Sequence, residues 1–227
     1  MPPPVVCQVR RLGLLPYAEA WELQKALAAQ RAADAIPDTL LLLEHPPTYT
    51  IGRSGSRDHV LIDAAAAGIE LLEVDRGGDA TYHGPGQLVG YPIMRTDDVL
   101  AFVRAMERAI VAALAEAGVE AGVRTEEGPD FTGVWAGDGK IASIGVHVQR
   151  GVTTHGFAVN VDNDLTPFEW IVPCGLPGVR MTSLGTESVR CFRKRMGHAF
   201  AREHGVRQRL VSRARLEAAL GAAPIPA

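Results

Sequence analysis

The chain has 227 residues, 47% of them apolar, and a net charge of −3, which suits one domain with a substantial core and argues against general nucleic-acid affinity. No apolar run approaches the roughly 20 residues that span a bilayer, and the first residues carry no basic or long apolar segment typical of a secretory signal. Three cysteines (Cys7, Cys174 and Cys191) give neither a disulfide framework nor a paired zinc-ligand spacing, so we expect a protein of the reducing cytoplasm.

The first half of the chain alternates apolar runs with turn residues. Pro16 and the apolar spacing after it predict a helix to about residue 34. Asp63 is placed to cap a short alanine-rich helix that Gly68 ends. Strands are predicted over 39–44, 48–51, 69–74 and 88–93.

The second half combines two long helices with three strands. One helix runs from a cap at Asp97 or Asp98 to Gly118, and another runs from about residue 187 to 204. Strands are predicted over 131–134, 140–148 and 153–161, a short last helix is capped by Ser212, and 222–227 form a frayed tail. With no repeat and no linker, the whole chain, 1–227, is predicted to be a single α+β domain whose sheet is mixed or mostly antiparallel and flanked by helices.

The stretch 76–87 contains four glycines and a proline between two predicted strands. Arginine, aspartate, threonine, tyrosine and histidine are threaded between them. Glycine lets a ligand approach the backbone closely, so the stretch is interpreted as a binding loop. A plain hairpin whose glycines only make turns remains the alternative.

Cys174 is the candidate nucleophile, because its loop is rich in proline and glycine and lacks apolar periodicity. Cys191 fits a buried helical cysteine instead. Lys140 is the candidate cation that would hold a thiolate. Regular strand alternation places Lys140 on the same face as Ala142 and Ile144, opposite Ser143. The alternative is a lysine at the end of a strand whose side chain only extends to solvent.

Small residues on two neighbouring strands suggest a narrow slot. Ser143 and Gly145 would face Gly156 and Ala158, either to admit a slender ligand or to allow close sheet packing. Three histidines lie in these stretches without a recognised metal-ligand spacing, and no Gly-x-Ser-x-Gly elbow supports a serine hydrolase; the histidines are His83, His147 and His155.

Four motifs together resemble the lipoyl(octanoyl) transferases of lipoate biosynthesis. They are Arg-Gly-Gly-x-x-Thr-Tyr-His-Gly-Pro-Gly-Gln-Leu-x-Gly-Tyr-Pro at 76–92, Gly-Lys-Ile-Ala-Ser-Ile-Gly at 139–145, His-Gly-Phe-Ala-x-Asn at 155–160 and Pro-Cys-Gly at 173–175. They occur in the family's order and cover nearly the whole chain. Asp79 stands where glutamine is expected, which makes its local contacts uncertain.

The resemblance implies the fold of biotin and lipoate protein ligases and an acyltransferase with a Cys174/Lys140 dyad. It implies transfer of octanoyl from acyl carrier protein to a lysine of lipoyl domains, in 2-oxoacid dehydrogenase E2 subunits and the glycine cleavage H protein. It implies no cofactor, metal or nucleotide, and no nucleic-acid or membrane partner. The substrate-binding residues that it implies are Arg76, Gly77, Gly78, Asp79, Ala80, Thr81, Tyr82, His83, Ser143, Ile144, Gly145, Gly156, Phe157 and Ala158.

Two alternatives remain: an ATP-dependent ligase of the same fold, which needs no cysteine, and a carrier-binding module without catalysis. Residues 190–215 bear on partners, since they hold nine Lys or Arg and one acidic residue, Glu203. This segment is either a docking surface for an acidic carrier, with Arg193, Lys194 and Arg202 exposed, or an ordinary solvated helix.

Overall fold

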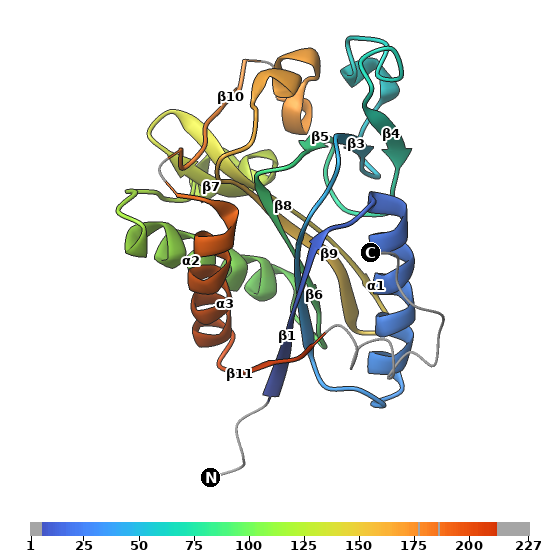
Figure 1. Cartoon of the computed structure of the whole chain (residues 1–227), viewed down its shortest axis with the longest axis vertical. Helices are drawn as coiled ribbons and strands as arrows, with labels where there is room; N and C mark the ends of the chain where they lie inside the picture. The colour runs from blue at the N-terminus through green and yellow to red at the C-terminus, as the bar shows by residue number, and fades with distance from the viewer. Residues whose placement is uncertain (1–5, 177, 186, 213–227) are drawn as a thin grey trace.

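The computed structural model describes residues 6–176, 178–185 and 187–212 (Figure 1). Its main sheet has eight strands in the order β10-β8-β9-β6-β2-β1-β11, with β7 paired to β8. The strands are β1 (Val6–Leu14), β2 (Thr39–Glu44), β6 (Gln87–Ile93), β7 (Gly133–Ala136), β8 (Gly139–Gln149), β9 (Val152–Asn160), β10 (Arg180–Met181) and β11 (Arg207–Leu210).

Pairing in this sheet is mixed. The central ladders β2–β6, β6–β9, β8–β9 and β7–β8 are antiparallel. Parallel pairs lie toward the edges, where β1 joins β2 and β11, and β10 joins β8. The predicted α+β class with a mixed, mostly antiparallel sheet is confirmed.

Helices cover both faces of the sheet, with α1 (Tyr17–Ala32) on one side and α2 (Val99–Glu116) and α3 (Val189–Glu203) on the other (Figure 1). Strand β2 explains this arrangement, because its four consecutive leucines are fully buried. Leu41 and Leu43 pack in the α1 core, while Leu40 and Leu42 pack with residues of α2 and α3. A strand buried on both faces reads as a continuous apolar run.

A second, three-stranded sheet carries the glycine-rich stretch. Its order is β4-β3-β5, from β4 (Glu70–Glu73), β3 (Thr48–Ile51) and β5 (Ala80–His83). Strand β5 lies inside the stretch predicted to be a loop. Residues 76–79 form the connection from β4, so their backbone is held between two short ladders.

Most predicted elements are present, with displaced ends. Asp98 caps α2 by accepting a hydrogen bond from the Ala101 amide at 2.9 Å. The helix predicted over 63–68 is wrong: Asp63 accepts a bond from the Ala66 amide, but the segment closes as a turn that ends at Gly68. Only Ala64 of the five alanine and glycine residues is buried, and so short a run is not enough to propagate a helix. The helix expected after Ser212 falls outside the described residues.

The basic segment is less available than its sequence indicates. Arg193 is mostly buried, with its guanidinium 2.8 Å from the Glu44 carboxylate. Arg202 is exposed but pairs with Glu116 and Glu203, whereas Lys194 is exposed. The prediction that Arg193 is exposed is therefore wrong, because a carboxylate from β2 holds it.

Two further findings concern the rest of the described chain. Cys7 is buried, whereas Cys191 is exposed, so the buried position predicted for Cys191 is wrong. No helix among the described residues is long and apolar enough to cross a membrane.

Candidate functional site

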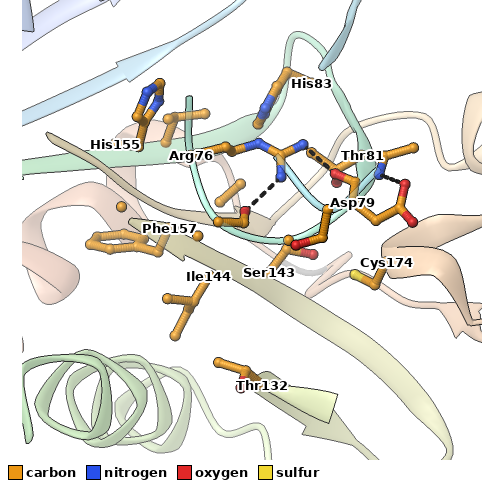
Figure 2. Close-up of a pocket in the computed structure, with 18 of the residues that line it drawn as sticks. Arg76, Asp79, Thr81, His83, Thr132, Ser143, Ile144, His155, Phe157 and Cys174 are labelled. Atoms are coloured by element: carbon orange, nitrogen blue, oxygen red, sulfur yellow. Dashed lines mark hydrogen bonds between the residues drawn. The ribbon is translucent and has the colours of Figure 1, made fainter. Parts of the chain in front are cut away.

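A pocket of about 340 Å³ lies between the sheet and the glycine-rich stretch. Residues 143–145 of β8 and 155–158 of β9 line it, with residues 76–81 on the other side. Cys174 lies at one side of the pocket, and His155 and Phe157 lie at the opposite side (Figure 2). The strand register explains how the predicted slot forms, since Ser143 pairs with Ala158 and Gly145 pairs with Gly156.

Cys174 lies in a short turn of 3₁₀ type, Pro173–Gly175, with left-handed backbone angles (φ 59°, ψ 17°). A non-glycine residue rarely adopts this conformation, and such strain concentrates at functional sites. Gly175 is also left-handed, with φ of +68°. These two successive left-handed residues place the Cys174 side chain in the pocket lining rather than in the core.

Lys140 projects to the same place from β8. It is 1% exposed, and its Nζ donates a hydrogen bond to the Cys174 Sγ at 3.1 Å. The Trp135 ring centroid lies 5.5 Å from the same nitrogen. A Cβ on Gly133 would lie 2.8 Å from the Lys140 Cε, so the absence of a side chain at Gly133 makes room for the lysine.

A β-bulge turns Lys140 toward the pocket. Trp135 pairs with Lys140 while Val134 pairs with Ala142, which leaves Ile141 as an extra residue in β8. Ile141 and Ala142 consequently pack in the same core cluster. The face predicted for Lys140 is therefore wrong: the bulge reverses the alternation and places Lys140 with Ser143 in the pocket lining.

Arg76 fixes the backbone of the glycine-rich stretch. Its guanidinium is buried and donates to the carbonyl oxygens of Thr50, Gly77 and Asp79 and to the Thr50 hydroxyl. Burial lowers the pKa of Arg76 from its ordinary value. Because these acceptors belong to β3 and to the stretch itself, the arginine ties the connection from β4 to the neighbouring strand.

Asp79 links this stretch to the turn that holds Cys174. One carboxylate oxygen accepts a bond from the Ala80 amide at 2.6 Å, and the other lies 2.8 Å from Nδ1 of His59. The two atoms are close, but no aligned hydrogen bond forms between them. A Cβ on Gly175 would lie only 2.7 Å from the same Asp79 oxygen, so the residue after Cys174 packs directly against this carboxylate.

Three buried histidines and two tyrosines gather at the pocket end opposite Cys174. His155 is turned toward α1 by a left-handed φ of +57° within β9, where regular alternation would place it with Phe157 on the other face. Burial lowers the pKa values of His45 and His155 to about 4 and that of His83 well below its ordinary value. All three imidazoles are therefore neutral near pH 7.

The predicted site residues are almost all in the pocket lining. Tyr82 is the exception, since it lies on the other face of β5 and packs in a separate core cluster with Tyr49 and Phe168. Residues that the sequence did not single out for the site also line the pocket, in particular Tyr17, Val89 and Tyr91. Tyr91 lies two residues beyond Val89 in β6, and this alternation is the signal that would have found the pair.

Comparison with known proteins places the chain in a family. The Lipoyl protein ligase A/B catalytic domain matches residues 16–201. The chain belongs to this family. An octanoyltransferase from Solibacter usitatus is 49% identical over 205 residues, which cover 86% of this chain and 90% of that protein. One from Geobacter metallireducens is 51% identical over 180 residues, covering 78% of this chain and 81% of that protein.

Solved structures share the fold. A lipoate-protein ligase A bound with ATP superposes with a TM-score of 0.76 at 21% identity, covering 94% of this chain and 91% of that one. A putative lipoate protein ligase from T. acidophilum with bound lipoic acid gives 0.75 at 21% identity, with coverages of 94% and 92%. A bipartite lipoate protein ligase, described with its E2 lipoyl domain from Thermoplasma acidophilum, gives 0.75 at 19% identity, with coverages of 95% and 90%.

Proposed function

We propose that the chain transfers an octanoyl group, through a thioester on Cys174, to a lysine of lipoyl domains in lipoate biosynthesis. The observation that carries the proposal is the 3.1 Å contact between the Lys140 Nζ and the Cys174 Sγ at the pocket. Octanoyltransferases about 50% identical over most of the chain support the choice of acyl group.

In the first step, the Cys174 thiolate attacks the carbonyl carbon of an octanoyl thioester. A new carbon–sulfur bond forms at Cys174, the bond to the donor sulfur breaks, and the donor leaves as a thiolate that takes up a proton. The Lys140 ammonium favours the attacking thiolate by charge, and the effect is large because the lysine is almost fully buried.

In the second step, the ε-amine of the acceptor lysine attacks the thioester. The amide bond forms, the carbon–sulfur bond to Cys174 breaks, and Cys174 returns to the thiolate. The amine must lose a proton, and Lys140 is placed to receive it after giving up its own proton during the first step. An amide replaces a thioester, so the transfer needs no nucleotide.

The partners follow from this chemistry. We infer octanoyl-acyl carrier protein as the donor. The acceptors that we infer are the lipoyl domains of 2-oxoacid dehydrogenase E2 subunits and the glycine cleavage H protein. We infer a cytoplasmic location, because Cys174 and Cys191 are free thiols, which suits a reducing compartment.

Intact-mass measurement after mixing with octanoyl carrier protein tests the proposal. We expect one octanoyl adduct that hydroxylamine removes and that Cys174→Ala abolishes. Cys191→Ala is the matched control, since Cys191 is exposed on α3 and should leave the adduct unchanged. An adduct that persists in Cys174→Ala would mean that another residue carries the acyl group. A strict need for ATP would instead indicate the ligase reaction.

A further inference from the structure

The pocket end opposite Cys174 is polar. Along β8 the lining continues from Lys140 to Gly145, about 15 Å at the rise of a β-strand. Gly145 pairs with Gly156, next to His155. Tyr17 and Tyr91 line the pocket and contact the His155 ring, so an acyl chain that starts at Cys174 points its methyl end toward them.

The hydrogen of the Tyr91 hydroxyl is committed to His45. Nδ1 of His45 lies 2.6 Å from the carbonyl oxygen of Leu15, which can only accept, so this nitrogen carries the proton. Nε2 of the neutral ring must then accept, and the Tyr91 hydroxyl donates to it at 2.7 Å. The ring is fully buried, which keeps it neutral.

The hydrogen of the Tyr17 hydroxyl is committed in the same way. Nε2 of His155 lies 2.7 Å from a carboxylate oxygen of Asp75, so it donates there. Nδ1 of His155 then accepts from the Tyr17 hydroxyl at 3.2 Å. The two hydroxyls also hydrogen-bond each other. Their hydrogens are therefore used within this cluster, while each oxygen keeps at least one lone pair for an occupant of the pocket.

We propose that Tyr17 and Tyr91 form a polar stop that limits the length of the acyl chain and favours a hydrogen-bond donor at its far end. The inference rests on the proposed function, because it needs the acyl group to lie in this pocket. A methyl group pressed against the two oxygens removes their water and returns no hydrogen bond, which disfavours a chain that is too long. A terminal hydroxyl on such a chain restores that bond.

A series of N-acetylcysteamine thioesters tests the stop in the unmodified protein. The donors are octanoyl, dodecanoyl and 12-hydroxydodecanoyl, and kcat/KM is measured for transfer to a lipoyl domain. We expect dodecanoyl to be used far less well than octanoyl, and its 12-hydroxy form to be used about tenfold better than dodecanoyl. Equal use of the two twelve-carbon donors would overturn the proposal.

Phenylalanine variants then identify the oxygens. Tyr91→Phe and Tyr17→Phe remove one oxygen each. The ratio of kcat/KM for 12-hydroxydodecanoyl to that for dodecanoyl should therefore fall several-fold, and kcat/KM for dodecanoyl should rise relative to that for octanoyl. Tyr49→Phe is the matched control, because Tyr49 is a fully buried tyrosine that donates to the Pro167 carbonyl in a different core cluster. Unchanged ratios in both pocket variants would contradict the assignment.

The outcomes separate this inference from the proposed function. If no donor acylates Cys174, the proposed function fails. If octanoyl acylates Cys174 but the 12-hydroxyl group brings no advantage, only the polar stop fails. The ratio between two donors in the unmodified protein decides the inference even if a phenylalanine variant does not fold.

Discussion

The Lys140 Nζ lies 3.1 Å from the Cys174 Sγ, although 34 positions separate the two residues in the chain. The lysine is 1% exposed, and among the described residues no carboxylate lies within ion-pair distance of it. The sulfur is thus the hydrogen-bond partner that the geometry offers to the Lys140 nitrogen. A buried charge interacts more strongly with its neighbour than an exposed one, because water screens it less.

Lys140→Met should slow the alkylation of Cys174. Removing the ammonium leaves the thiolate without its neighbouring cation, so we expect the iodoacetamide rate at pH 7 to fall at least about tenfold. The measurement belongs in a Cys191→Ala background, since Cys191 is exposed and reacts as well. Lys194→Met removes an exposed lysine and serves as control; equal rates in the two lysine variants would reject the role of Lys140.

Gly133→Ala should displace Lys140. A Cβ there would clash with the carbonyl oxygen of Ala142 and lie 2.8 Å from the Lys140 Cε, at a φ of +138° that favours glycine. We expect kcat for octanoyl transfer to fall at least about tenfold, since a shift of about 1 Å at a reacting group has effects of that order. Gly137→Ala is the control: its φ is +55°, but a Cβ there meets nothing within 4 Å.

Stability measurements complete this comparison. Both glycines adopt a positive φ, so both variants should lose about 1 kcal/mol or more of unfolding free energy. Loss of transfer in Gly133→Ala with full transfer in Gly137→Ala would locate the effect at the space that Gly133 leaves beside Lys140 and the Ala142 carbonyl. Similar transfer rates in the two variants would argue that Lys140 does not need the space at Gly133.

The sequence predicts the fold well where local patterns decide it. The leucines at 40–43 and the capped helix that begins after Asp98 carry their structure in their own residues. The edge strands β10 and β11 and the neighbouring strand β1 were not predicted, because pairing with distant segments forms them: β1 lies beside β11 from the far end of the chain. Strand β5 was not predicted either, because it lies in a glycine-rich stretch and forms by pairing with β3.

The site shows the same division. The sequence alone suggests Cys174 as a nucleophile and Lys140 as its neighbouring cation. The face of β8 that Lys140 occupies, however, depends on the bulge at Ile141. The left-handed backbone of His155 likewise reverses the alternation of β9. Tyr17 reaches the pocket only because α1 packs on the sheet, which no local pattern records. Register and long-range packing decide these positions.

Gly175→Ala should impair transfer through a contact with Asp79. The new Cβ would lie 2.7 Å from the Asp79 carboxylate, and this group is fixed by the Ala80 amide and close to His59. We expect the turn to shift and kcat to fall by about tenfold or more. Gly178→Ala is the matched control, since its φ is also positive, at +82°, and a Cβ there meets nothing within 4 Å.

A double variant tests whether the clash is the cause. Asp79→Ala removes the carboxylate, so Asp79→Ala with Gly175→Ala should recover part of the activity lost in Gly175→Ala. The measurement is kcat for all four members of the cycle, and contacting residues should couple by about 0.5–3 kcal/mol. Strictly additive losses would mean that the two residues act independently.

The buried histidines should make the fold sensitive to acid. Burial lowers the pKa values of His45 and His155 from an ordinary 6.5 to about 4. Between these values the unfolded chain binds protons that the folded chain does not. The free energy of unfolding is therefore fully retained above about pH 6.5 and falls as the pH drops toward 4, by at most about 3 kcal/mol for each histidine.

Urea unfolding at several pH values measures this loss, and His45→Asn isolates one contribution. Asparagine can still donate to the Leu15 carbonyl but cannot take up a proton, so the slope of unfolding free energy against pH between 4 and 6.5 should become shallower than in the unmodified protein. His198→Asn replaces an exposed histidine on α3 and should leave the slope unchanged. Carboxylates also titrate near pH 4, but they contribute equally in the three proteins. A slope that is the same in all three would mean that protonation of His45 does not drive the acid sensitivity.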